Sequence, residues 1–359
     1  MRINVAAMST DSQVSTLQDD LQIAIQLEQS TLPLYLCALW SIYGTSAGAT
    51  AAQNSILTVI NEEMIHLAIA CNILNATGGQ PSINGSVLGS QGQSFPVPAY
   101  WPEGPLPGHS QTSNPFVVGL GPVGPASLQT FMDIELPQYD DPTPPPGGWA
   151  TIGEFYDEII TLINALSDSD FQSTTNGQAS DIANNPTPPG SGTIYQVNSV
   201  QSALTALNEI IVQGEGTQAN HDSGPGELAH YYQFQQVLQS IQQNGTWTNY
   251  QQDVYNMVTD PGNPVNLADF PANAITLNTQ VNTIYSQLLD ALHSGFNSSS
   301  PDDNLSNAEY TVMPSLQAPV QQLMQIPLNN QGGVMCGPTF QYTSSGKPKP
   351  KAARRKKRR

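Results

Sequence analysis

A carboxylate and an imidazole stand three residues apart at two places in the sequence. In "LTVINEEMIHLAIACNIL" (residues 57–74) the pair is Glu63 and His66, and in "GELAHYYQFQQVL" it is Glu227 and His230. Residues three apart share one face of a helix, and both pairs fall on faces that are otherwise apolar. A buried carboxylate must be protonated, hydrogen-bonded or bound to a cation, because an unpaired buried charge costs several kcal/mol.

The usual protein cations are missing from most of the chain. Of the ten Lys and Arg residues, Arg2 is the first and the other nine lie between Lys347 and Arg359. All 28 Asp and Glu residues lie within residues 3–346, a segment that contains no Lys or Arg. The formal net charge of the chain is −18. Because a salt bridge to Lys or Arg is excluded there, a metal ion is the leading candidate to neutralise a buried acid.

Two further acids complete the predicted set of inward-facing carboxylates. Glu28, in "LQIAIQLEQSTLPLYL", lies at helical spacing with Leu21, Ala24 and Leu32. Glu215, at the end of "VQSALTALNEIIVQGEGT", lies at the edge of an apolar stripe. Two other acids are predicted to be solvated: Glu62 sits about 100° around its helix from Glu63, and Glu209 falls on the face opposite the stripe.

Helices that aim Glu and Glu-x-x-His inward are typical of a carboxylate-bridged two-metal site in a four-helix bundle. Carboxylates hold iron or manganese in two oxidation states and bridge the ions at about 3.5–4 Å, while each His adds a neutral nitrogen. We therefore predict two iron ions, with manganese as the alternative metal. The predicted ligands are Glu28, Glu63, His66, Glu215, Glu227 and His230. The nearby tyrosines, which would carry protons or electrons or simply pack in the core, are Tyr35, Tyr231 and Tyr232.

The elements that would position these residues are helices separated by loops rich in Pro and Gly. Residues 80–148 show little helical period and are predicted to be an ordered surface excursion with short extended pieces such as "FVVGL". Thr151 and Glu154 fit a capping box at the start of a helix. The predicted helices cover 15–43 with an interruption at Pro33, 50–76, a segment opening at Thr151, 200–213, 227–242, 272–294 and 304–324.

This pattern predicts a mainly α protein. Its expected parts are an N-terminal segment at 1–14, a metal-binding bundle at 15–245, a C-terminal helical extension packed on the bundle at 246–343, and a disordered basic tail at 344–359. Three scattered cysteines favour a reducing compartment, the cytoplasm. No signal peptide or apolar window long enough for a membrane span is expected. The tail "GKPKPKAARRKKRR" is a candidate nuclear localisation signal, polyanion contact or tether to an acidic surface.

Several runs resemble a known family: "LQIAIQLEQSTLPLYLCALWSI", "VINEEMIHLAIACNILNATGGQP", "IIVQGEGT" and "ELAHYYQF". They are similar to the ferritin-like domain family that includes the iminophenyl-pyruvate dimer synthase of violacein-type pigment biosynthesis. The resemblance implies a ferritin-like four-helix bundle with long loop excursions and additional C-terminal helices, and a metal site at the six residues named above. In one branch of the family it also implies oxidative coupling of two imino acids derived from an aromatic amino acid. This chain is shorter than the pigment enzyme and has no Lys or Arg in residues 3–346 to hold a substrate carboxylate.

Two classes of function follow from these observations. The first is a metal-dependent oxidoreductase, with a di-iron or mixed iron and manganese centre, that uses dioxygen or peroxide to oxidise a small organic molecule. The second is a non-catalytic protein that stores iron or in which the metals brace a core without cations. The sequence assigns no catalytic residue beyond the predicted metal ligands.

Overall fold

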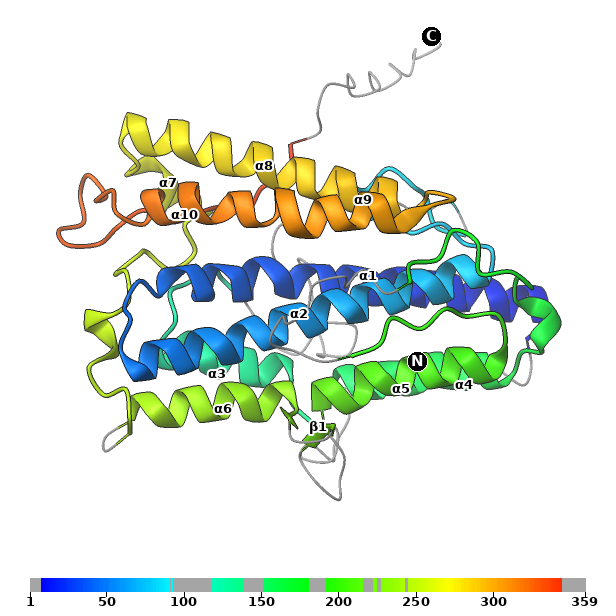
Figure 1. Cartoon of the computed structure of the whole chain (residues 1–359). Coiled ribbons are helices and arrows are strands. Elements are labelled where there is room, and N and C mark those ends of the chain that lie inside the picture. Colours follow the sequence, from blue (N-terminus) through cyan, green and yellow to red (C-terminus); the bar gives the residue numbers. More distant parts are fainter. Residues whose placement is uncertain are drawn as a thin grey trace, which may run out of the picture.

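Two long antiparallel helices form the centre of the molecule. The computed structural model describes residues 8–90, 92, 118–137, 151–180, 192–215, 222–224, 227–242 and 245–343. In it, α1 (Thr10–Ser41) and α2 (Ala47–Ala76) lie side by side along most of their length (Figure 1). The remaining described helices form one layer on each side of this pair.

Four shorter helices make the layer that completes a bundle with α1 and α2. They are α3 (Pro125–Ile134), α4 (Ile152–Asn164), α5 (Val200–Glu215) and α6 (His230–Ile241). Helix α3 packs against α6 at one end of the molecule, and α4 packs against α5 at the other end (Figure 1). The layer therefore corresponds to two bundle helices, each broken near its middle. This mainly α architecture confirms the predicted fold class.

Proline and glycine explain where the two helices break. Pro137 follows the C-cap of α3 at Glu135 by two residues, where proline commonly stops a helix. The sequence has the "GEG" of residues 214–216 where α5 ends and the "GPG" of residues 224–226 before α6 begins. The described part of this connection includes two short antiparallel strands, β1 (Asp222–Gly224) and β2 (Glu227–Leu228). Both breaks leave helix ends in the middle of the molecule.

Helix α1 is longer than predicted and is not interrupted. It starts after Ser9, whose hydroxyl accepts the backbone N–H of Ser12, rather than near Ser15. It also continues through Pro33, although proline removes one helical hydrogen bond and costs about 3 kcal/mol in a helix interior. Residues on all sides of α1 are buried from Leu27 to Ala38, so tertiary packing outweighs that local cost.

Helix α2 is buried on nearly all sides because α1, α5, α6 and the C-terminal helix α8 (Ala272–Phe296) contact it. Its 18-residue apolar window has a mean hydropathy of 1.4, so by length and composition it is a candidate membrane span, contrary to the prediction that no such window exists. In the fold, 72% of that window is buried against protein, as in the core helix of a bundle. The helix ends at Ala76, and Gly78 follows with a φ of 81° that favours glycine.

The C-terminal helices cover the opposite side of the α1 and α2 pair (Figure 1). Helix α8 (Ala272–Phe296) pairs with a second run made of α9 (Pro301–Asn307), a π turn at Ala308–Val312, a 3-10 turn at Pro314–Leu316 and α10 (Gln317–Leu323). Before them lies the short α7 (Pro264–Ala268). The chain after α10 is fixed to α8 where the Thr339 hydroxyl meets Asn278 and Asn282.

The main difference from the predicted elements lies within residues 80–148. Helix α3 occupies part of this stretch, which was expected to have no helix. The described residues of "FVVGL", 118–120, are not in a strand, and its first two residues lie outside the described part of the chain. Helix α6 starts at His230, three residues later than predicted, because Glu227 and Leu228 belong to β2.

The side chain of Asn72 in α2 ties two loop segments to the bundle. Its amide donates to the carbonyls of Ala179 and Tyr195 at 2.8 and 2.9 Å, and its oxygen accepts the N–H of Ala179 at 2.8 Å. We expect Asn72→Ala to lower the free energy of unfolding by about 2–3 kcal/mol, because it leaves the backbone groups that bond to Asn72 without hydrogen-bond partners. Urea unfolding followed by circular dichroism measures the change. Asn54→Ala, at an exposed position of the same helix, should stay within about 0.5 kcal/mol of the parent; equal losses in the two variants would contradict the assignment.

Candidate metal centre

Glu63 lies at the centre of a buried cluster where α1, α2 and the broken helices meet. Its Oε2 accepts a hydrogen bond from the Thr31 hydroxyl at 2.9 Å. Its Oε1 lies 2.8 Å from Nδ1 of His230 and 3.9 Å from Nδ1 of His66. The carboxylate of Glu63 therefore faces one ring nitrogen of each histidine, and ligand atoms of these three residues all lie within 4.8 Å of one another.

Both histidines direct Nδ1 toward the centre and Nε2 away from it. The two rings are stacked, with centroids 5.3 Å apart and an interplanar angle of 25°. Nε2 of His66 meets the amide oxygen of Gln213 at 2.9 Å, and Nε2 of His230 meets a carboxylate oxygen of Glu62 at 3.0 Å. Each outer contact leaves Nδ1 as the inward-facing atom of its ring.

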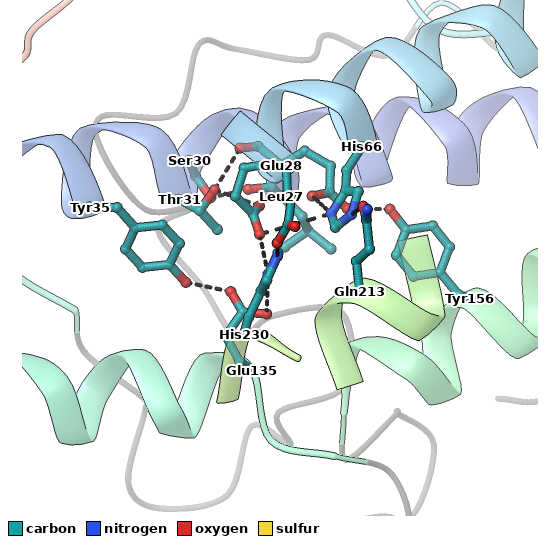
Figure 2. Close-up of polar contacts among 12 residues, drawn as sticks. Leu27, Glu28, Ser30, Thr31, Tyr35, His66, Glu135, Tyr156, Gln213 and His230 are labelled. Atoms are coloured by element: carbon teal, nitrogen blue, oxygen red, sulfur yellow. Dashed lines mark hydrogen bonds and ion pairs between the residues drawn. The ribbon is translucent and has the colours of Figure 1, made fainter. Parts of the chain in front are cut away.

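Each histidine has a second carboxylate beside it, and each of these carboxylates accepts a hydrogen bond from a tyrosine. Oε2 of Glu28 lies 3.6 Å from Nδ1 of His66, and its Oε1 accepts the hydroxyl of Tyr156. Oε2 of Glu135 lies 3.5 Å from Nδ1 of His230, and its Oε1 accepts the hydroxyl of Tyr35 at 2.5 Å. Figure 2 shows the two tyrosines flanking the cluster on opposite sides. The centre thus has two similar halves, each made of Tyr, Glu and His, with Glu63 between them.

The ends of the four short helices bring several of these groups into place. Glu135 caps the C-terminal end of α3, and His230 is the first residue of α6. Tyr156 lies in the second turn of α4, and Gln213 lies in the last turn of α5. The two breaks described above therefore occur at the level of the cluster, where helix ends can approach α1 and α2.

Burial and mutual charge shift the pKa values of the cluster. Burial, followed by the charges of Glu135 and Glu28, raises the pKa of Glu63 to about 8. Burial alone would lower the pKa of each histidine, but the nearby carboxylates outweigh it, so the pKa of His66 is raised and that of His230 is raised well above its ordinary value. For Glu28, burial is outweighed by His66, which lowers the pKa. When no metal is bound, protons on these groups offset the negative charge of the buried carboxylates at neutral pH.

A small cavity adjoins the cluster between the N-terminal end of α4 and the C-terminal end of α5. Its volume is about 30 Å³. Its lining includes polar groups of the cluster and the apolar side chains of Leu27, Ile152, Ile210 and Ile211. A space of this size holds a dioxygen molecule or one or two waters.

The described residues of the cluster could hold a metal ion. Nδ1 of His230 is buried and, although it lies 2.8 Å from Glu63, has no hydrogen-bond partner among the described residues. The other inward atoms are carboxylate oxygens and Nδ1 of His66, the donor set that iron and manganese accept. Each histidine also has the outer hydrogen bond that metal-bound histidines usually make.

The structure brings four of the six predicted ligands together: Glu28, Glu63, His66 and His230. Glu215 ends α5 and Glu227 lies in β2, but their side chains lie outside the described residues. The helical spacing used to pair Glu227 with His230 is wrong, because the helix starts only at His230. Among the tyrosines, Tyr35 reaches the cluster through Glu135, whereas Tyr231 and Tyr232 meet edge-on with centroids 5.0 Å apart.

The prediction that Glu62 is solvated is also wrong. Its side chain is fully buried beside His230. Other helices pack against α2 on several faces, whereas the prediction assumed that a single apolar face of this helix is buried. Glu209 is half-buried and accepts the backbone N–H of Thr193. At α4, the Thr151 hydroxyl accepts the N–H of Glu154, which is one of the two hydrogen bonds of the predicted capping box.

Sequence analysis missed three residues of the centre: Glu135, Tyr156 and Gln213. Glu135 continues the apolar spacing of Leu128, Phe131 and Met132, and Pro125 marks the start of that helix, so a signal was present in a stretch dominated by Pro and Gly. Tyr156 and Gln213 lie on apolar faces of α4 and α5, where a tyrosine or glutamine does not stand out from ordinary core residues.

Comparisons with known proteins agree with this fold. The family profile described as "Ferritin-like" matches residues 21–239, more than half of the chain. A crystal structure of a ferritin-like protein from Caulobacter vibrioides superposes with a TM-score of 0.58 at 22% sequence identity, covering 91% of this chain and 97% of that one. At this identity the likeness shows the fold alone. A comparison with curated proteins gives no match.

Metal binding at this cluster should release protons. At pH 7, below the raised pKa values of Glu63 and His230, these two groups hold protons that a bound cation must displace. We expect about two protons released per chain at pH 7 and a metal affinity that rises with pH. Calorimetric Mn²⁺ titration in buffers with different ionisation enthalpies measures the number. Binding without proton release, or an affinity that falls between pH 6 and 8, would contradict the protonated cluster.

Proposed function

The chain belongs to the ferritin-like family, and from this premise we propose that it is an oxidoreductase that binds two transition-metal ions, iron or manganese, in the buried cluster. Its oxidant is dioxygen or peroxide, and its electron donor is a small organic molecule. The observation that carries the proposal is the inward orientation of Nδ1 on both histidines around Glu63, in an interior without Lys or Arg.

The residues that would hold the metals are Glu28, Glu63, His66, Glu135 and His230. Iron or manganese bound there would supply a change of oxidation state that protein side chains lack. The hydroxyl of Thr31 fixes one oxygen of Glu63, and the tyrosines fix Glu28 and Glu135. Burial raises the pKa of Tyr35 and Tyr156 well above the ordinary value, so each tyrosine keeps its proton on the hydroxyl oxygen.

The size of the cavity supports a small oxidant at the cluster. About 30 Å³ beside Ile152, Ile210 and Ile211 admits dioxygen or hydrogen peroxide. Reduction of one peroxide to two waters takes two electrons and two protons, which the organic donor would lose. An imino acid, oxidised or coupled in secondary metabolism, is the specific donor that the sequence resemblance suggests; an aromatic one is larger than this cavity.

Iron storage or structural bracing by metal is the second candidate. The observation in its favour is the acidic character of residues 3–346, which carry all 28 acidic residues and no Lys or Arg. A storage protein would take up many irons per chain, whereas the buried cluster has ligands for a pair. Metal stoichiometry therefore separates the two candidates.

We expect the purified protein, loaded anaerobically with Fe²⁺ or Mn²⁺ and desalted, to retain two metal ions per chain by elemental analysis. Glu63→Ala should abolish this uptake, because it removes the carboxylate shared by both histidines. The matched control is Asp157→Ala, an exposed position on α4, which should retain both ions. Two ions with dioxygen- or peroxide-dependent turnover support the oxidoreductase, many irons per chain support storage, and no retained metal in the parent protein rejects both.

The basic tail is proposed to contact a polyanion or an acidic protein surface, with the protein in the cytoplasm or, through the tail, in the nucleus. The nine Lys and Arg residues from Lys347 to Arg359 have no acidic residue among them. Such a segment binds polyanions by releasing counterions, so the binding weakens steeply with salt.

Trypsin cleaves after Lys and Arg and should therefore cut only after Arg2 and within the tail. We expect the intact protein to be retained on heparin at low salt, and the trypsin-trimmed protein to flow through, because residues 3–346 are acidic. Elution against a salt gradient measures retention, and mass spectrometry confirms the cut. Equal retention before and after trimming would contradict the role of the tail. The trimmed protein should keep both metal ions.

A further inference from the structure

The two halves of the cluster differ in the group that holds the outer nitrogen of each histidine. Nε2 of His66 faces the neutral amide oxygen of Gln213, and Nε2 of His230 faces the carboxylate of Glu62. The two contacts have nearly equal lengths, 2.9 and 3.0 Å. All four side chains are buried, with at most 3% of their surface exposed. Geometry and burial are therefore matched, and the chemical difference between the halves is an amide in one place and an acid in the other.

Hydrogen bonding fixes the same tautomer in both rings. The amide nitrogen of Gln213 donates to Glu209 at 3.3 Å, which leaves its oxygen toward His66. With the carboxylate oxygen of Glu62 as the acceptor, Nε2 of His230 carries the hydrogen. Each histidine thus donates outward from Nε2 and offers the lone pair of Nδ1 to the centre when the ring is neutral.

The inner partners of the two histidines are groups of the same kind, although Glu63 lies closer to Nδ1 of His230 (2.8 Å) than to Nδ1 of His66 (3.9 Å). Glu63 faces both Nδ1 atoms, Glu28 stands beside His66, and Glu135 stands beside His230. A tyrosine hydroxyl donates to each of the two flanking acids. An anionic acceptor on the outer nitrogen makes an imidazole a stronger ligand than a neutral acceptor does, and such outer partners change metal affinity by about 10–100-fold.

We propose that the two metal positions are unequal, and that Glu62 is the positioning residue that makes the position at His230 the tighter one. The position at His66, supported by Gln213, fills second. This inference rests on the proposed two-metal centre and adds to it an order of filling set by residues that do not themselves face the metals.

Titration with Mn²⁺, followed by the electron paramagnetic resonance signal of the free ion, tests the inference without any measurement of activity. The parent protein should show two steps whose dissociation constants differ by about 10-fold or more. His230→Ala should remove the tighter step, and His66→Ala should remove the weaker one. Two equal steps, a single bound ion, or loss of the tighter step in His66→Ala would overturn the inference.

Two charge-changing variants then assign the difference to the outer partners. Glu62→Gln should weaken the tighter step by about 10–100-fold and leave the weaker step nearly unchanged, so that the two steps merge. The reciprocal variant, Gln213→Glu, should strengthen the weaker step and leave the tighter one nearly unchanged. A role limited to net charge would instead move both steps together in each variant, which would overturn the assignment to Glu62.

Circular dichroism of the metal-free proteins reports whether each variant folds. If Glu62→Gln does not fold, Gln213→Glu still tests the inference. It places a carboxylate beside the outer nitrogen of His66, so a selective gain in the weaker step would show that this outer partner sets the affinity. Absence of any Mn²⁺ binding to the parent protein would reject the two-metal centre itself. Two bound ions of equal affinity would leave that centre in place and reject only the inequality.

Discussion

The structure depends on one constraint: four carboxyl groups and two imidazoles are buried together in a chain that has no Lys or Arg between residues 3 and 346. The carboxyl groups belong to Glu28, Glu62, Glu63 and Glu135. Burying like charges without compensation is costly, so the cluster needs protons or metal ions. Protons can serve, since the pKa values of Glu63 and both histidines are raised when no metal is bound. Metal ions would replace those protons with the charge that the sequence lacks.

The broken helices follow from the need to place these groups within reach of each other. A continuous helix directs about one side chain per turn toward a given point. Two helix ends that face each other can both direct side chains toward that point. The breaks place Glu135 and Tyr156 beside the cluster from one side, and Gln213 and His230 from the other. Pro and Gly terminate the helices at these points. Helix α3 packs on α6, and α4 packs on α5, beside these breaks.

The sequence predicts those parts of the centre that stand on long, continuous helices. Glu28, Glu63 and His66 lie on apolar faces of α1 and α2, where a polar residue among Ile, Leu and Ala is visible from spacing alone. His230 was found as well, but through a helical pairing with Glu227 that the structure does not have. Glu135 escaped because its helix is short and lies in a Pro- and Gly-rich stretch. Glu62 was misplaced because one stripe cannot describe a helix surrounded by neighbours.

Diffraction from crystals soaked in Mn²⁺, with anomalous scattering recorded from the metal, tests the account most directly. If the cluster binds two metal ions, we expect two peaks about 3.5–4 Å apart. One should lie beside Nδ1 of His66 and one beside Nδ1 of His230, with Glu63 between them. Peaks confined to surface carboxylates, or a metal bound at Nε2 of either histidine, would contradict it.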